Sequence, residues 1–494
     1  MKIASPKLHT THLTANEEAR LRCQSALEQK DKGNYEGAQE VMRRLWRGIG
    51  EPPCLEGLHI SAAADVLFCV GVLTGWIGSK NQIKEAQETA RNLITQSITY
   101  YESVADATRV AAGRTEIAYC YWRDGNLNEA RTLLHEALKK LTTPGNTKAR
   151  ALLKLTTVEC SAARYHEAFL ILNENAALFE KIANHTTRGT YHTEFAIVLR
   201  NLSGSLKKEE YLRRAIQEFE RADYEFKLAR NPVFRAAVKN NISMVLLNLS
   251  RFKEAHKYLD EARRLAVSFK DKARVAQVDE SIAQVLIAEG KFKLAEVVAR
   301  RAVSALEKTG HQCLVADALI TYGITLARQG KNDRAKFIFQ KAVEVALQVD
   351  AANKAGLAAL SMIEEIDDLS PATLQAAYQQ TREWLAGSQS QDVLVRLNEA
   401  AGKVTASLRG ELSSDQATEI ILSKPCDLQG KILKYEKSLI KQALSQANGR
   451  VTHAASLLSV SYQALSYIIE SRHRDLLKER SPVHRRRARK PQGA

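Results

Sequence analysis

The stretch Gly290–Ala302, "GKFKLAEVVARRA", decides how most of this chain folds, because two neighbouring stretches repeat its pattern. "SRFKEAHKYLDEA" begins at Ser250 and "GKNDRAKFIFQKA" begins at Gly330, so the period is 40 residues twice over. Self-similarity at this spacing predicts stacked structural units. The small residues that mark the pattern are Ala255, Ala295 and Ala335, and again Ala262, Ala302 and Ala342.

Weaker copies of the same pattern precede these three. We expect each small residue to let the two helices of a hairpin approach closely, while the Gly or Asn before it forms a tight turn. No single hairpin covers its own apolar face, so neighbours must stack into a superhelix with a concave surface. The corresponding alanines of the weaker copies are Ala38, Ala86, Ala130, Ala168 and Ala215.

These residues resemble the tetratricopeptide repeat (TPR), in the longer-period form of many bacterial sensors and regulators. The resemblance covers residues 15–386, about eight to nine hairpins, and implies an α-solenoid that docks a protein or peptide partner on its concave surface. Asn241 is expected as a polar residue of that surface. We expect the three aromatic residues of the clearest copies in the core, namely Phe252, Phe292 and Phe339.

Composition agrees with an all-α chain. The 494 residues are 45% apolar and include only 24 Gly and 9 Pro, which favours helices. The seven cysteines form no CxxC pair, which is typical of free thiols in a reducing compartment. The uncharged run at residues 66–79 is too short to span a bilayer and predicts a buried helix. With no signal peptide at the start, we expect a cytoplasmic protein without a membrane partner.

Enzyme signatures are scarce. The sequence has no GxxxxGK[ST], HExxH or GxSxG motif and no Cys/His cluster at zinc spacing. His9 and His12 lie in an N-terminal extension, residues 1–14, where two imidazoles seldom hold a metal unaided. We therefore expect no enzyme activity, no cofactor and no metal. One carboxylate cluster is interpreted as a solvated helix end, Glu364, Glu365, Asp367 and Asp368.

The repeat pattern ends at the "GSQSQ" that begins at Gly387. Residues 387–430 then form one amphipathic helix and a linker. The helix, "DVLVRLNEAAGKVTASL", carries a helical apolar stripe. Two interpretations stay open, a last packing helix of the array or a dimer seam.

Basic charge is concentrated at the end of the chain. The formal net charge is +16, and residues 431–494 hold 14 Lys and Arg against 4 Asp and Glu, a net of +10. A basic cluster of this density commonly meets nucleic acid or an anionic membrane surface. An alternative interpretation of this basic cluster is a tail that only increases solubility.

The stretch Gly449–Arg474, "GRVTHAASLLSVSYQALSYIIESRHR", is too short for another repeat hairpin and predicts a helix-turn-helix. We expect Thr452 and Ser461 to cap its two helices and Ala455 to lie where the helices cross. The predicted core residues are Ala454, Leu458, Val460, Leu465 and Ile468. The preceding helix should roof this core with Ile432, Leu433, Leu439, Ile440 and Leu444.

Residues 431–480 resemble the Fis-type helix-turn-helix that ends many bacterial transcription regulators. The matching residues are Leu439, Ala443, Leu444, Gly449, Ala454, Ala455, Leu458, Val460, Ser461 and Leu465. Ser459 stands at the turn where the family usually has Gly, which predicts a strained turn. The resemblance implies sequence-specific DNA binding and a two-fold homodimer.

The second helix of this domain should read bases, because Gln pairs with adenine and Tyr reaches phosphates or thymine methyl groups. The base-reading candidates are Ser461, Tyr462, Gln463, Ser466 and Tyr467. The phosphate-contact candidates are Arg450, Thr452, His453, Arg472, His473 and Arg474, with Arg485, Arg486, Arg487, Arg489 and Lys490 in a basic, disordered tail at 481–494.

Two hypotheses of function follow from these features. The first is a bacterial transcription regulator that binds DNA through its C-terminal domain and a partner through its array. The alternative is an interaction scaffold with a vestigial helix-turn-helix, whose basic tail binds acidic proteins or RNA. The neutral second helix keeps this alternative open.

Overall fold

The computed structural model describes residues 13–479, except residues 82, 204–207, 350, 389 and 410–427. His9, His12, the linker after residue 409 and the tail candidates Arg485 to Lys490 lie outside the described residues. The described part of the chain is helical throughout, without a β-strand, which confirms the all-α prediction. It forms two compact units, Met1–Thr405 and Ala406–Ala494.

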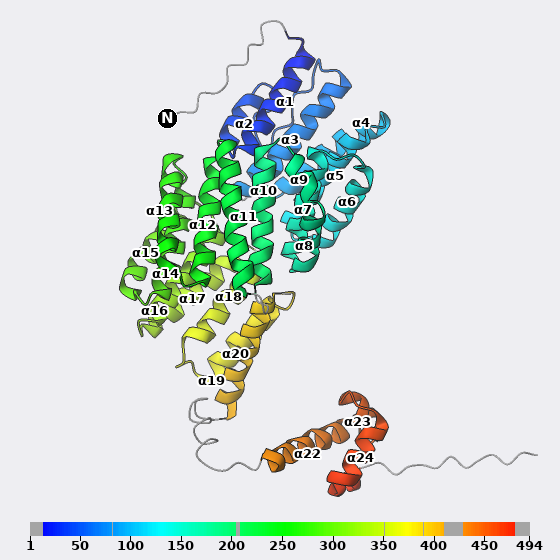
Figure 1. The fold of residues 1–494 in the computed structure, drawn as a ribbon, viewed down its shortest axis with the longest axis vertical. Helices are drawn as coiled ribbons and strands as arrows, with labels where there is room; N and C mark the ends of the chain where they lie inside the picture. Colours follow the sequence, from blue (N-terminus) through cyan, green and yellow to red (C-terminus); the bar gives the residue numbers. More distant parts are fainter. Residues whose placement is uncertain are drawn as a thin grey trace, which may run out of the picture. The chain divides into compact units, whose positions relative to one another are not determined.

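The first unit is a stack of helical hairpins (Figure 1). Its helices are α1 (Ala15–Asp31), α2 (Tyr35–Met42), α3 (Ile60–Lys80), α4 (Ala86–Ser103), α5 (Ala107–Arg123), α6 (Leu127–Lys140), α7 (Asn146–Ser161), α8 (Tyr165–Glu174), α9 (Ala176–Lys181), α10 (His185–Leu202), α11 (Lys208–Leu228), α12 (Pro232–Asn248), α13 (Phe252–Ser268), α14 (Lys272–Ala288), α15 (Phe292–Glu307), α16 (Gln312–Ala327), α17 (Asn332–Leu347), α18 (Ala352–Glu365), α19 (Pro371–Trp384) and α20 (Gln391–Arg409).

The alanines of the repeat pattern are buried as predicted. Each of the eleven named above is at most 1% exposed, in the clear and the weak copies alike. Phe339 is fully buried against Gly323, where an added Cβ would lie only 2.7 Å from the ring. Phe252 and Phe292 are only partly buried. Small residues therefore set the close approach of the helices, and aromatic rings fill the remaining space.

The turns inside the hairpins also recur with the 40-residue period and share one backbone conformation. Ser250, Gly290 and Gly330 occupy equivalent positions, with φ of 57°, 73° and 72°. This left-handed backbone is easy for Gly and costs a non-Gly residue about 1 kcal/mol. Gly290 and Gly330 therefore adopt the backbone conformation that this turn requires without that cost.

The superhelix returns toward its own beginning. Asn231, just before α12, donates a hydrogen bond from Nδ2 to the carbonyl oxygen of Asp31 at the end of α1, at 3.0 Å. Val233 packs beside Gly33, 3.4 Å from where a Cβ would lie. Figure 1 shows α1 and α2 next to the upper ends of α10 to α12. Hairpins about 200 residues apart thus enclose the space between them.

Helix α20 packs against the last hairpin. Ala400 and Val404 are buried in the array core, and Arg396 forms a bidentate ion pair with Glu364, at 2.8 and 2.7 Å. Within this chain, the contacts of this helix fit the interpretation of a last packing helix of the array.

The carboxylate cluster at the end of α18 is only partly a solvated helix end. Asp367 and Asp368 are exposed as expected. Glu364 instead holds α20, and Glu365 pairs at 2.5 Å with Arg328, which follows the last residue of α16. The expectation failed for these two because their partners come from elements that are distant in sequence.

Helix α3 is long and apolar enough to cross a membrane by length and composition alone. In this fold two-thirds of its most apolar window is buried among neighbouring helices. The run at residues 66–79 is therefore a buried core helix, as predicted.

The second unit contains a small separate core. Its helices are α22 (Leu428–Gln446), α23 (Val451–Leu457), α24 (Tyr462–Arg472) and the 3₁₀ helix η1 (Arg474–Glu479). The buried residues of this core are Ile440, Ala443, Leu444, Ala447, Ala454, Ala455, Leu465, Ile469 and Leu476.

Candidate functional site

The helix-turn-helix forms with the short first helix that the sequence predicts. Asn448 and Gly449 have φ of 50° and 75°, so the backbone breaks sharply between α22 and α23. Ser459 has φ of 55° in the turn between α23 and α24, which confirms the predicted strain. Ala455 is 2% exposed at the helix crossing.

The two predicted N-caps have different outcomes. The Ser461 hydroxyl accepts a hydrogen bond from the Ala464 amide at 3.1 Å, as expected. Thr452 was expected to cap α23, but the helix begins at Val451 and Arg450 holds the cap position without a side-chain bond. Thr452 is therefore exposed on the first turn of α23.

Three residues predicted for the core of this domain are exposed, and a fourth, Ile468, is only partly buried. Val460 is 39% exposed, and Ile469 rather than Ile468 is fully buried, because α24 turns Leu465 and Ile469 inward at four-residue spacing. Leu433 and Leu439 are also exposed, at 38% and 39%. Ile440 and Leu444 form the roof of the core as predicted, together with Ala443 and Ala447.

The outer face of α24 carries the base-reading candidates. Ser461 and Gln463 are exposed, while Tyr462 and Tyr467 are 51% and 69% exposed. Ser466 is only partly buried. The helix thus presents hydroxyl and amide groups to solvent from one side and buries Leu465 and Ile469 on the other.

The residues predicted to contact phosphates lie in two groups at opposite ends of the motif. Arg450, Thr452 and His453 are exposed together at the start of α23, and Arg472 and Arg474 are exposed at the other end of the motif. Arg472 also lies 3.3 Å from Glu436 of α22.

His473 is not available as a phosphate contact. Its side chain is only 4% exposed to solvent, and Nε2 lies 2.8 Å from Oε2 of Glu436. This contact joins the end of α24 to α22. The prediction for this residue was wrong because a carboxylate from another helix holds the imidazole in the core.

A second candidate site lies inside the array, on α2, α3 and α5. A stack of four aromatic rings begins at Tyr35 and continues through Trp76, Tyr119 and Trp122, with centroids 6.4, 5.2 and 4.8 Å apart. The Arg123 guanidinium lies 4.3 Å from the Trp76 ring centroid. Such cation–π contacts stabilise a buried cation beside aromatic faces.

Ion pairs surround this aromatic stack. Lys154 Nζ lies 2.6 Å from Glu116, and Arg150 bridges Glu116 and Asp31 at 3.4 and 3.5 Å. Burial raises the pKa of Glu116, but the Lys154 and Arg150 cations outweigh it and lower that pKa to about 2. Burial also lowers the pKa of Lys154, to about 8. The cations of this wall therefore already have carboxylate partners.

A cavity of about 350 Å³ opens between this wall and the helices α10 to α12. Asn241 lines it, as expected of a polar residue on the inner surface. Glu194 of α10 also lines it and accepts a hydrogen bond from Thr157 Oγ1 at 3.3 Å. Burial raises the pKa of Glu194 to about 7.

A second carboxyl, which is buried, lines a further cavity of about 500 Å³ in the array. Glu280 accepts a hydrogen bond from Thr321 Oγ1 at 2.6 Å and another from Gln284. Burial raises the pKa of Glu280 to about 7 as well. This cavity also contains Arg396, which is paired with Glu364.

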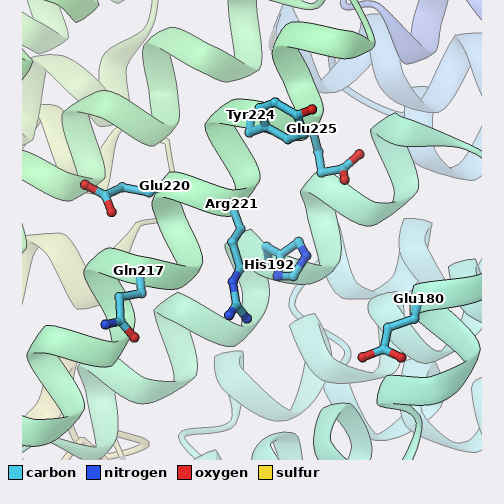
Figure 2. Close-up of a pocket in the computed structure, with 7 residues that line it drawn as sticks. All are labelled: Glu180, His192, Gln217, Glu220, Arg221, Tyr224 and Glu225. Atoms are coloured by element: carbon cyan, nitrogen blue, oxygen red, sulfur yellow. The ribbon is translucent and has the colours of Figure 1, made fainter.

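Figure 2 shows a broader depression over α9, α10 and α11, lined by Glu180, Gln217, Glu220, Tyr224 and others. His192 and Arg221, at its centre, share the carboxylate of Glu218 at 2.7 and 3.0 Å. The central charges of this depression are thus paired within the protein, so it is a weaker candidate than the cavity at Glu194.

The sequence reasoning missed the residues of the inner cavity. Trp76, Glu116, Lys154 and Glu194 lie in four different hairpins, and no motif joins them. One signal was available, since "LLKLTT" and "TEFAIV" place a charge inside an otherwise buried helical stripe.

Among the described residues, no group of three or more His, Cys, Asp or Glu side chains is arranged to hold a metal ion. The six described cysteines are unpaired.

Two family models match the chain. The model described as bacterial regulatory protein, Fis family, matches residues 434–469, which include α23 and most of α22 and α24. The tetratricopeptide repeat model matches residues 316–348, the hairpin of α16 and α17. No curated protein matches the sequence.

Solved structures share the helical-repeat architecture at low sequence identity. A Rap protein complexed with competence and sporulation factor is 12% identical over 69% of this chain and 99% of that chain, with a TM-score of 0.47. A signal transduction ATPase with a tetratricopeptide repeat sensor from Pyrococcus horikoshii is 15% identical over 75% of this chain and 55% of that chain, with a TM-score of 0.47.

Aspartyl phosphate phosphatase F from Bacillus subtilis is 12% identical over 78% of this chain and 96% of that chain, with a TM-score of 0.46. The chain thus contains a segment that matches the tetratricopeptide repeat, residues 316–348, and a C-terminal segment that matches the Fis family of bacterial regulatory proteins, residues 434–469.

Proposed function

We propose that this protein is a cytoplasmic, DNA-binding transcription regulator whose array docks a protein or peptide partner. The single observation that supports DNA binding most strongly is the exposed face of α24, with Tyr462, Gln463 and Tyr467 in solvent above a buried Leu465 and Ile469. A helix of this form enters the major groove in helix-turn-helix proteins. The unpaired cysteines fit a reducing compartment.

Each group on this face has a definite role in the proposal. Gln463 donates to and accepts from adenine in bidentate fashion, and Tyr462 and Tyr467 contact phosphates or thymine methyl groups. Arg450, Thr452 and His453 position the start of α23 on the phosphate backbone. Arg472 and Arg474 do so at the other end, and the tail cations Arg485 to Lys490 add sequence-independent affinity.

The first experiment is a selection of genomic DNA fragments on the full-length protein. We expect an enriched sequence motif, and Gln463→Ala should relax preference at one base position. A matched control is Gln442→Ala, which makes the same change on the exposed face of α22 and should leave the motif unchanged. A selection that enriches no motif would refute sequence-specific binding.

The salt dependence of DNA binding tests the tail. Removing residues 481–494 deletes five Lys and Arg. The slope of log affinity against log salt should become less steep by up to about 4 to 5. A sequence-specific remnant should survive, because the reading face of α24 is intact.

The scaffold alternative rests on one observation, that α24 has no Lys or Arg before Arg472. On that alternative the truncation abolishes all DNA binding, and a partner captured through the tail survives nuclease treatment.

We also propose that the protein pairs two-fold through its C-terminal unit. Helix α22 exposes Leu433, Tyr435 and Leu439, with Tyr435 at 69%. Exposed apolar residues grouped on one helix favour a protein interface. Leu439→Lys should then shift the full chain to monomer in sedimentation velocity, whereas the control Leu457→Lys on α23 should not. A wild-type monomer at all accessible concentrations would contradict the pairing.

A further inference from the structure

The cavity at Glu194 is enclosed because the superhelix returns to its start. Its walls come from α1, α3, α5, α7, α10, α11 and α12, so residues of six hairpins meet there. At about 350 Å³ the cavity lies near the lower end of the range for small-ligand sites. Its size suits one or two side chains of a partner rather than a folded surface.

Glu194 is the charged residue lining this cavity for which the structure gives no oppositely charged partner. Lys30, Arg150 and Lys154 on the opposite wall are all paired with Asp31 or Glu116. For Glu194 the structure holds one neutral donor, the hydroxyl of Thr157 at 3.3 Å, and no cation within 4 Å among the described residues. A carboxylate with one neutral partner in such surroundings is costly to ionise, and an incoming cation removes that cost.

The rest of the lining suits the stem of a long cationic side chain. Leu153, Phe226, Phe234, Ala237 and Val238 provide apolar and aromatic surface. Lys and Arg pack their methylene groups on such surface while the charged end reaches a polar partner. A collar of threonine hydroxyls also lines the cavity and can accept hydrogen bonds from the remaining N–H groups of the cation. These hydroxyls belong to Thr157, Thr186, Thr187, Thr190 and Thr193.

We propose that Glu194 anchors the Lys or Arg side chain of a peptide segment that docks inside the array. This inference rests on the proposed docking function of the array and names the chemistry of its partner. The pairing is the reverse of carboxylate capture by basic residues, since here the protein supplies the anion. The aromatic lining then holds the stem, and the threonine collar orients the charged end.

The test is a selection of random nine-residue peptides on the full-length protein at pH 8, with heparin present to occupy the basic C-terminal region. The selected peptides are then synthesised with acetylated N-termini and titrated against wild type, Glu194→Gln and Glu280→Gln. Glu280→Gln is the matched control, because it neutralises a buried, hydroxyl-bonded carboxyl in a different cavity. Thermal unfolding confirms that each variant is folded.

We expect one Lys or Arg to recur in the selected peptides. Its replacement by norleucine, and Glu194→Gln in the protein, should each weaken binding about tenfold or more, while Glu280→Gln should not. Binding of the same peptides should also weaken below pH 7, where Glu194 is protonated.

Three results would overturn the inference, and they are distinguishable. Peptides that bind wild type and Glu194→Gln equally leave the docking function standing but remove Glu194 from it. Peptides that share an acidic residue, or that bind only with a free N-terminus, assign a different anchor. Selection of no peptide removes the docking function and this inference together.

Discussion

Glu194→Gln should make the protein more stable at neutral and alkaline pH. The substitution keeps the shape of the side chain and its hydrogen bond from Thr157 but removes a partly buried negative charge. In the folded protein the carboxyl keeps its proton up to about pH 7, whereas in the unfolded chain it releases the proton near the ordinary value of 4.5. The folded state therefore binds more protons between these two values, and wild-type stability falls as pH rises through this window.

The size of the effect follows from the two pKa values. The difference between 4.5 and about 7 corresponds to about 3 kcal/mol lost from the wild type above pH 7. The amide cannot ionise, so the variant avoids this loss. At pH 5 the gain should be below about 1 kcal/mol, because little of the window has been crossed.

The measurement is the midpoint of thermal unfolding at pH 5 and pH 8. For a unit of this length, about 3 kcal/mol corresponds to a rise of about 3 to 4 °C at pH 8, with a much smaller rise at pH 5. Glu51→Gln, an exposed position, is the control and should change neither midpoint. Equal shifts at both pH values, or a lower midpoint for Glu194→Gln at pH 8, would refute the assignment of a partly buried carboxylate without a cationic partner.

Four further predictions concern packing, backbone conformation and one ion pair. Gly323→Ala should destabilise the array by about 1 to 3 kcal/mol in thermal unfolding, because its Cβ would lie 2.7 Å from the buried Phe339 ring. Gly402→Ala, with no atom within 4 Å of the new Cβ, should instead stabilise α20 by about 0.5 to 1 kcal/mol. Ser459→Gly should relieve the left-handed turn and slow hydrogen exchange in α22 to α24, by about 1 kcal/mol. Arg396→Ala should release α20 from Glu364 and expose it to limited proteolysis.

The repeat architecture was readable because its determinants are local. Ala255, Ala295 and Ala335 recur at 40 residues and are fully buried. The helix-turn-helix was readable for the same reason, since the break at Gly449, the cap at Ser461 and the buried Leu465 lie within one short stretch. Errors arose where burial depends on a partner from another helix.

His473 and Glu364 illustrate those errors. The sequence around His473 is basic and polar, which predicted an exposed phosphate contact. Glu436, 37 residues earlier, binds the imidazole at 2.8 Å and keeps it in the core. Glu364 was interpreted as part of a solvated helix end, yet Arg396 of α20 holds it from 32 residues away. Spacing along the chain carries no signal for such pairs.

By itself, the sequence determined the all-α class, the 40-residue stacking unit and the change to a basic helix-turn-helix, because each depends on side-chain periodicity over a few turns of helix. Only the tertiary structure decided that Glu194 lies opposite Trp76 and Lys154 in one cavity. The reason is geometric. Each hairpin adds a small rotation to the next, and their sum over about 200 residues brings Asn231 back to Asp31 and closes the space in which Glu194 has no cation.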